Sequence, residues 1–182
     1  MSAPTPTRSN DQVAAACLLT SGVSVLTAAH DGVVHGATVS SASLFSRNPP
    51  AVCAALRTGS LLTKLALDSG TFVVNVLSER QAPLAEWFAN PRRPAGIEQF
   101  AFVAWEPDLS TGIPSLRDTL AAFTCRVSQR IQLADHDLLL AAVAEGSIGV
   151  GRPLVSFGNT LCGAEFHAIA RRRPGAPITT LE

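Results

Sequence analysis

The stretch that most constrains the fold is a run of small residues followed by a proline pair and an apolar segment, Gly36 to Leu56. The first part is expected to be a strand, yet it carries glycine, alanine, serine and threonine where core strands usually carry bulky branched residues. Small side chains let a flat molecule lie close to the strand backbone, with hydroxyls and amides available to its polar edge. An edge strand or a close sheet-to-sheet contact would need the same residues, so this run alone leaves both interpretations open.

The composition indicates one globular domain. Of 182 residues, 47% are hydrophobic and 15% are charged, which is enough to bury a sizeable core. Lysine plus arginine equals aspartate plus glutamate at 14 each, which argues against nucleic acid as a partner. No apolar run reaches the roughly 20 residues of a membrane-spanning helix, and the first residues lack the apolar centre of a signal peptide. We therefore expect a cytoplasmic protein without a membrane partner.

The cysteines are far apart and form no CxxC pair, so free buried thiols are expected and a metal site is not. They are Cys17, Cys53, Cys125 and Cys162. Composition also marks the two ends of the domain. Residues 1–12 are expected to be a flexible arm, residues 13–170 the domain, and residues 171–182, which begin with three arginines, a flexible tail.

The first elements are predicted from capping and turn signals. A residue of the Ser9–Asp11 stretch can cap a helix that runs to about Leu19 and stops at Gly22. Val23 to Ala29 is expected to be a strand, and Asp31-Gly32 is a strong signal for a two-residue hairpin.

That hairpin leads into the run of small residues and places His30 and His35 diagonally on the same face. With no third ligand apparent, two hydrogen-bonded histidines near a turn are expected rather than a metal site.

A turn after the proline pair has the features of an anion site. Pro49-Pro50 cannot donate ladder bonds, so the sheet is expected to break there before Ala51 to Leu56 continues as a buried strand. Arg57 to Ser60 then leads into a helix that Ser60 caps and Gly70 ends. An arginine, a threonine and a glycine at a helix N-terminus can cradle an anion, although an ordinary capped helix has the same sequence.

The remaining elements favour a mostly β fold. We expect a short amphipathic helix at Glu79 to Phe88, a surface loop or lid at Asn90 to Glu98, and a turn at Asp135-His136-Asp137. Further strands are expected at Thr71–Leu77, Phe100–Trp105, Leu120–Gln132, Leu138–Ile148, Leu154–Phe157 and Gly163–Ala170. Because most strands are joined by hairpins and no GxGxxG turn is present, an antiparallel barrel with a few peripheral helices is predicted, not a Rossmann domain.

Several segments between about Val13 and Gly163 resemble the flavin reductase-like family. They are TSGVSVLTA, HGATVSSASLFSRNPPAVCAALRTGSLLTKLALDSGTFVVNVL, LAEWFAN and DHDLLLAAV. Members are small NAD(P)H:flavin oxidoreductases with an FMN-binding, Greek-key split β-barrel, and they often supply reduced flavin to a separate monooxygenase. The resemblance therefore implies a flavin reductase that binds FMN or FAD and uses NADH or NADPH. A barrel of this size leaves apolar strand faces uncovered, so a homodimer is expected.

The resemblance also implies the site residues. The TVSS segment would lie against the flavin ring, and the turn that starts at Arg57 would hold the phosphate. The implied flavin-binding residues are Ala37, Thr38, Val39, Ser40, Ser41, Asn48, Ala55, Arg57, Thr58, Ser60 and Leu61. His136 would be the catalytic residue, close to the nicotinamide and flavin N5, and Asn159 and Thr160 would be further nucleotide contacts.

Two departures from the family pattern keep other functions open. The chain has Ala141-Ala142-Val143 where the family often has Gly-Glu-Val, and Ser156 to Gly163 lacks the family's tyrosine and arginine. A flavin-binding carrier or sensor without reductase activity is one alternative. A split-barrel oxidase of the pyridoxamine phosphate type is another, since fold alone does not separate these functions.

Overall fold

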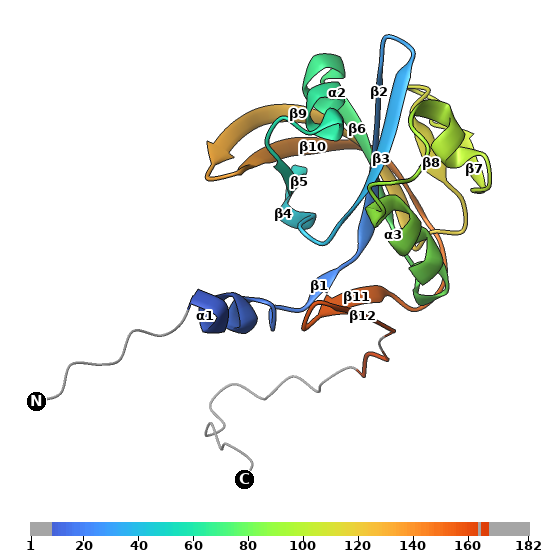
Figure 1. The fold of residues 1–182 in the computed structure, drawn as a ribbon. Helices are drawn as coiled ribbons and strands as arrows, with labels where there is room; N and C mark the ends of the chain where they lie inside the picture. Colours follow the sequence, from blue (N-terminus) through green and yellow to red (C-terminus); the bar gives the residue numbers. More distant parts are fainter. Residues whose placement is uncertain (1–8, 164, 168–182) are drawn as a thin grey trace, which may run out of the picture.

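The computed structural model describes residues 9–163 and 165–167 (Figure 1). Most of the expected arm at 1–12, the expected tail at 171–182 and residues 168–170 of the expected last strand lie outside the described residues. Within the described part, no helix is both long and apolar enough to cross a membrane.

Seven strands form one sheet that curls into a barrel, in the order β3-β2-β6-β9-β10-β5-β4 (Figure 1). Their bounds are β2 (Ser24–His30), β3 (Val33–Val39), β4 (Ser43–Arg47), β5 (Pro50–Arg57), β6 (Thr71–Val76), β9 (Ala121–Leu133) and β10 (His136–Ile148). Every neighbouring pair is antiparallel. The two outermost strands, β3 and β4, are joined by residues 40–42, so this short link spans the gap between the ends of the sheet. The expected antiparallel barrel is confirmed.

Two hairpins decide how the run of small residues is used. The β2–β3 turn is Asp31-Gly32, with φ of 48° and 76°, the left-handed values that a two-residue turn of this kind requires. The proline pair does not break the sheet, contrary to expectation. Asn48 and Pro49 form the tight turn of the β4–β5 hairpin, and Pro50 already pairs with Arg47. Proline is tolerated there because Pro50 is the first residue of β5, and the pairing of β5 with β10 begins only at Ala51.

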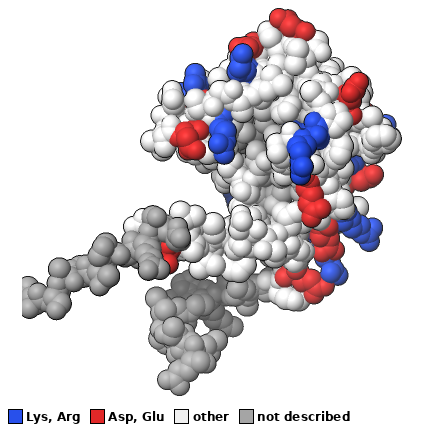
Figure 2. Space-filling view, in the orientation of Figure 1, with Lys and Arg blue, Asp and Glu red and all other residues white. Residues whose placement is uncertain are grey.

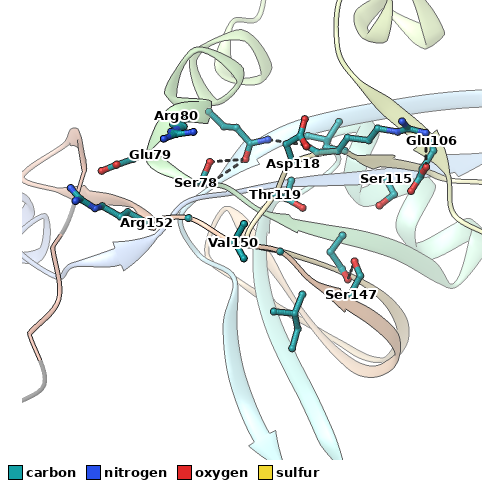
Figure 3. Close-up of a pocket in the computed structure, with 17 residues that line it drawn as sticks. Ser78, Glu79, Arg80, Glu106, Ser115, Asp118, Thr119, Ser147, Val150 and Arg152 are labelled. Carbon is teal, nitrogen blue, oxygen red and sulfur yellow. Dashed lines mark hydrogen bonds and ion pairs between the residues drawn. The ribbon is translucent and has the colours of Figure 1, made fainter.

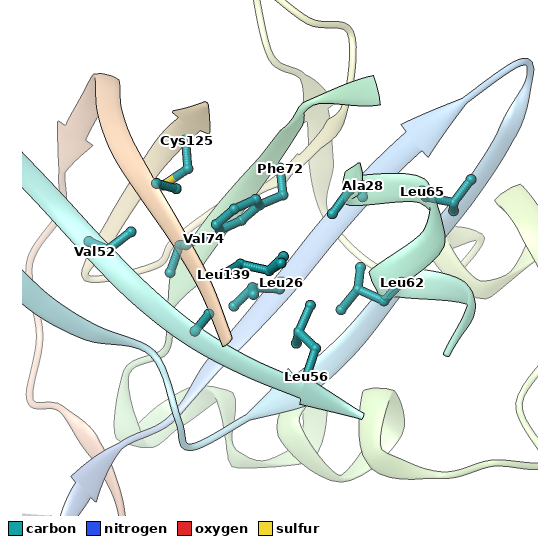
Figure 4. Packing of buried hydrophobic residues seen from close by; sticks show 13 residues of the cluster. Leu26, Ala28, Val52, Leu56, Leu62, Leu65, Phe72, Val74, Cys125 and Leu139 are labelled. Atoms are coloured by element: carbon teal, nitrogen blue, oxygen red, sulfur yellow. The ribbon is translucent and has the colours of Figure 1, made fainter. Parts of the chain in front are cut away.

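Helix α2 (Leu61–Ser69) covers the interior of the barrel. The side chain of Ser60 caps it by accepting the N–H of Thr63, and Gly70 ends it with a left-handed φ of 69°, both as expected. Figure 4 shows Leu62 and Leu65 of α2 beside the buried strand residues Leu26, Ala28, Leu56, Phe72 and Leu139. Burying one leucine in this way contributes about 2 kcal/mol to stability.

A second apolar layer covers the other side of β2 and β3. It is built from η1 (Glu79–Gln81), α3 (Ala82–Ala89), η2 (Gly96–Phe100), β7 (Trp105–Pro107) and β8 (Pro114–Leu116). Because β2 is covered on both sides, its residues are buried without alternation. The expected strand Phe100–Trp105 is wrong: Phe100 ends a 3-10 helix, and Trp105 starts a strand that pairs with β8.

A small separate sheet joins an early and a late segment of the described residues, in the order β1 (Ser21–Gly22), β11 (Leu154–Phe157) and β12 (Thr160–Gly163). The expected helix to Leu19 is too long, since α1 spans Ser9–Ala16, and Gly22 belongs to β1 rather than to a helix stop. The expected strand from Gly163 is also misplaced, because Gly163 is the last residue of β12 and residues 165–167 form no strand.

Candidate functional site

The turn after β5 has the geometry of an anion-binding site. Ser60 donates its backbone N–H to Arg57 O at 3.1 Å, and the hydroxyl of Thr63 donates to the same oxygen at 2.9 Å. Ser60 Oγ takes the N–H of Thr63 at 3.2 Å. The N–H groups of Leu61 and Leu62 have no acceptor among the described residues, so the positive end of α2 is open to a ligand.

Thr58 carries an orphaned hydroxyl in the same turn. Its backbone N–H donates to Asp135 O at 2.9 Å, but its buried Oγ1 has no hydrogen-bond partner among the described residues. A buried hydroxyl without a partner costs stability unless a ligand or a water molecule bonds to it. Together with the exposed Arg57 cation and the first turn of α2, it forms a donor set that fits a phosphate group.

The link between β3 and β4 lies against β5. Ser41 donates its hydroxyl to Ala55 O at 2.7 Å, which holds the link beside the strand that leads into the anion turn. Ala37 and Val39 pack on the barrel core. Thr38 donates its hydroxyl to Ala85 O of α3 at 2.7 Å, so this hydroxyl keeps an acceptor but not a donor for a ligand.

Packing inside the chain accounts for Gly36. A Cβ there would lie 2.8 Å from the ring of Phe88 and 3.3 Å from that of Phe100. Gly36 is therefore not available to a ligand, and the part of the small-residue run that is open to a ligand begins at Thr38.

His136 lies directly beside the anion turn. It is the first residue of β10 and pairs with Arg57 of β5. Its Nδ1 lies 2.8 Å from Asp135 Oδ1, a hydrogen bond that lowers the pKa of this carboxyl, with smaller help from the charge of Arg57. Asp137, the other acidic residue of the expected turn, points away: it is fully buried and accepts from Arg130 Nε at 2.8 Å. The turn itself consists of Ala134 and Asp135, because His136 already pairs with Leu133.

Not all expected site residues come together in one chain. Asn48 is in the β4–β5 turn, at the opposite end of β5 from Arg57. Asn159 and Thr160 belong to the β11–β12 hairpin, where Gly158 and Asn159 form the left-handed turn. Figure 1 shows this hairpin far from α2 and from the β9–β10 turn. A Gly-Asn dipeptide between two short runs of strand-forming residues is a hairpin signal that could have predicted this turn.

The structure also shows where the four cysteines and the two hairpin histidines lie. All four cysteines are free; Cys125 is buried, which raises its pKa to about 12, whereas the other three are only partly buried. His30 and His35 share a face of the β2–β3 hairpin, as the register requires. His35 bonds Arg93, and the described residues contain no group of three potential metal ligands.

A cleft of about 1320 Å³ lies away from these residues, between η1, the β8–β9 connection and the end of β10 (Figure 3). Arg80, Arg117 and Arg152 line it. Arg117 pairs with Glu106 at 2.8 Å and Arg152 with Glu165 at 2.7 Å, so two of these cations are already neutralised. None of the expected flavin or nucleotide residues lines this cleft.

A buried polar cluster beside β3 was not foreseen from the sequence. Arg93 comes from the stretch that was interpreted as a surface loop or lid, Asn90 to Glu98, and Gln99 lies between that stretch and the expected strand that begins at Phe100. Instead, their side chains hold the loop on β3 at Gly36. Nothing local in the sequence indicates this, because the partners are about 60 residues apart.

Comparison with known proteins places the chain in a family. A model of the flavin reductase like domain matches residues 16–165. The NADPH-flavin oxidoreductase of Streptomyces viridifaciens is 44% identical over 90% of this chain and 86% of its own. The reductase component of a 4-nitrophenol monooxygenase from Rhodococcus opacus is 39% identical over 74% of this chain and 69% of its own.

Solved structures agree. The flavin reductase component of a bacterial two-component tryptophan halogenase superposes with a TM-score of 0.80 at 26% identity, over 87% of this chain and 99% of its own. The chain therefore belongs to the flavin reductase-like family and has its split-barrel fold. The predicted class of enzyme, a flavin reductase that uses flavin and a nicotinamide nucleotide, is confirmed by this membership.

Proposed function

We propose that this chain reduces FMN or FAD with hydride from NADPH or NADH at the surface formed by Ser41, Ala55, Arg57, Thr58 and His136. The observation that carries this assignment is the anion turn, where an orphaned buried hydroxyl, an exposed arginine and a helix N-terminus lie beside His136. Bound flavin supplies an isoalloxazine ring that accepts a hydride from the reduced nicotinamide.

The residues of this chain bind and orient the two molecules. Thr58 Oγ1, Arg57 and the N–H groups at the start of α2 hold the flavin phosphate, while the backbone from Thr38 to Ser41 meets the polar edge of the ring. Fixed donors at that edge stabilise the negative charge that reduction builds there. No covalent step by the protein is needed, so catalysis consists of positioning.

Steady-state oxidation of NADPH and NADH, with and without added FMN or FAD, tests this function. Turnover that requires flavin supports it, and flavin binding without turnover favours the carrier or sensor. The relative at 44% identity is named for NADPH, which leads us to expect a higher kcat/KM with NADPH.

We assign His136 to orienting the nicotinamide near flavin N5. His136→Ala is expected to lower the rate of flavin reduction or raise the nucleotide KM, and to leave flavin affinity nearly unchanged. His30→Ala is the matched control, since His30 is also an exposed hairpin histidine beside an aspartate, 3.4 Å from Asp31. Equal, small effects of the two variants in stopped-flow reduction would mean that His136 is a turn residue.

We further propose that reduced flavin is released to a partner monooxygenase. The Rhodococcus relative is the reductase component of such a system, and the halogenase relative likewise serves a two-component enzyme. The test is to supply reduced flavin across a dialysis membrane to a flavin-dependent monooxygenase. Product formed without contact between the proteins supports release.

The cytoplasmic, homodimeric state is part of the same proposal. An apolar groove of about 500 Å³ opens beside the β3–β4 link and is lined by Leu44, Val52, Val76, Phe123 and Ile148 among others. Figure 2 shows few charges on the visible face between the barrel and the small sheet. We propose that a second copy covers this groove. Sedimentation equilibrium tests the dimer, and Leu44→Glu is expected to weaken it.

A further inference from the structure

We propose that Gln99 and Arg93 are positioning residues for flavin: they replace a neighbouring strand along the outer edge of β3 and so fix the backbone at Thr38 to Ser41. This inference rests on the proposed function. Both residues lie outside the flavin surface.

β3 is the first strand of the seven-stranded sheet, so only β2 pairs with it. Along such an edge, every second residue directs its N–H and C=O away from the sheet, where no ladder satisfies them. Gly36 is one of these residues. Its N–H donates to Gln99 Oε1 at 2.9 Å, and its carbonyl accepts from Arg93 Nη2.

Gln99 acts as a substitute for a strand peptide. While its oxygen accepts from Gly36, its amide nitrogen donates to Val34 O at 3.2 Å, two residues earlier on the same edge. The same nitrogen donates to Gly96 O at 2.7 Å, and Gln99 O accepts from Trp87 Nε1 at 2.8 Å. Gln99 is fully buried, so its carboxamide is fixed by the bonds with Gly36, Val34 and Gly96, and its backbone carbonyl by the bond from Trp87.

Arg93, in the loop after α3, is the second side chain that bonds the edge of β3, and we call Gln99 and Arg93 together the clamp. Besides Gly36 O, Arg93 donates to Asn90 O at 2.8 Å, lies 3.1 Å from His35 Nε2, and has its guanidinium 5.8 Å from the centre of the Phe88 ring. The contact with His35 requires a ring nitrogen that accepts. Burial, and secondarily the charge of Arg93, lowers the pKa of His35 to about 4, so the neutral ring is the stable form.

The clamp ends where the part of the β3 edge that is proposed to face the flavin begins. By the alternation of the strand, Thr38 also directs its N–H and C=O outward, and no described residue bonds to either group. The edge of β3 therefore has a closed half at Val34 and Gly36 and an open half from Thr38 onward. Because the two halves belong to one rigid strand, the clamp sets the position of the donors that meet the flavin ring.

Arg93→Ala tests the clamp, with Arg93→Lys as the conservative variant that keeps one donor for Gly36 O. Asp108→Ala is the matched control, since Asp108 also holds a loop on a strand, through bonds from Ser110, Thr111 and Thr124, at a place remote from β3. Flavin Kd is measured by fluorescence titration, together with kcat, both KM values and the melting temperature.

We expect Arg93→Ala to raise flavin Kd and flavin KM about tenfold. The kcat at saturating flavin and the nicotinamide KM should stay at wild-type values, and Arg93→Lys should be intermediate. Asp108→Ala should lower the melting temperature with no change in flavin Kd. If Arg93→Ala does not fold, Arg93→Lys makes the same comparison.

An unchanged flavin Kd in Arg93→Ala or in Arg93→Lys, with a lowered melting temperature, would mean that the clamp only stabilises the fold, and would overturn this inference alone. Failure of the wild-type chain to bind flavin would overturn the proposed function, and this inference with it.

Discussion

Two polar clusters beside the barrel use their hydrogen-bonding groups in opposite ways. Around Gln99, the side chain satisfies backbone groups of β3 and is itself satisfied, at full burial. Around Thr58, a buried hydroxyl has no partner among the described residues, and the neighbouring Arg57 is exposed. A satisfied cluster stabilises the folded chain, whereas an unsatisfied one is affordable mainly where a ligand completes it. This difference distinguishes residues that stabilise the fold from residues that bind a ligand.

Removal of the side-chain amide of Gln99 is the change expected to have the largest effect on the difference between the two clusters. In Gln99→Leu, the N–H of Gly36 and the carbonyl of Val34 lose their partner inside the protein. Two buried groups without partners should lower the free energy of unfolding by roughly 3 kcal/mol. Urea denaturation of the variant gives this number, and a loss below about 1 kcal/mol would show that the cluster is not structural.

Packing on the same edge provides a second, smaller effect. Gly36→Ala would place a Cβ 2.8 Å from the buried ring of Phe88 and should cost about 2 kcal/mol. Gly22→Ala is the matched control, since a Cβ there has no neighbour within 4 Å. Equal melting temperatures for the two alanine variants would contradict the close approach of α3 to β3.

The cluster beside β3 should also respond to pH through His35, whose buried Nδ1 has no partner among the described residues. The pKa of His35 is lowered from 6.5 to about 4, so the unfolded chain binds more protons between these values. Stability should therefore fall as the pH drops from about 6.5 to about 4. The loss should stay well below 3 kcal/mol, because the ring is only half buried and solvent screens it.

His35→Gln keeps an acceptor for Arg93 without titrating, so its unfolding free energy should be flatter than that of the wild type across this window. The loss of stability that protonation of Asp108 causes occurs at a lower pH. Burial tends to raise its pKa, but hydrogen bonds from Thr111, Thr124 and Ser110 outweigh burial and lower it to about 2. Parallel pH curves for wild type and His35→Gln would disprove the assignment.

The unsatisfied cluster should show the smallest change in stability and a clear change in binding. Thr58→Val removes the orphaned hydroxyl at constant shape, so unfolding should be unchanged or harder by up to about 1 kcal/mol. FMN affinity should fall several-fold, while riboflavin, which lacks the phosphate, should bind as before.

Thr63→Val is the contrasting control, since the Thr63 hydroxyl donates to Arg57 O at 2.9 Å and its loss should destabilise the turn. Equal weakening of FMN and riboflavin binding by Thr58→Val would show that the phosphate does not bind at this turn. The same contrast makes Arg57→Ala a cleaner probe than Ser60→Ala, because the hydroxyl of Ser60 also caps α2.

Local signals in the sequence were enough to predict the barrel and much of the turn at Arg57. Asp31-Gly32 and Ser60 act through neighbours within a few residues, so their effect is readable before folding. The bond between Gly36 and Gln99 spans 63 residues, and no local pattern encodes it. His136 does not bond Asp137 for a geometric reason: consecutive residues of a strand point to opposite faces. Phe100 to Trp105 alternates like a strand, but packing of the Phe100 ring against Phe88, 5.3 Å apart, fixes a 3-10 turn instead.

The side chains of Gln99 and Arg93, which replace a neighbouring strand along β3, also affect solubility. An uncovered strand edge is a template on which another chain can pair, and long exposed edges invite aggregation. Here, one carboxamide and one guanidinium occupy the acceptors and donors at Val34 and Gly36, so a foreign strand would first have to displace buried bonds. Loss of Gln99 should therefore also lower the fraction of the expressed protein that is soluble.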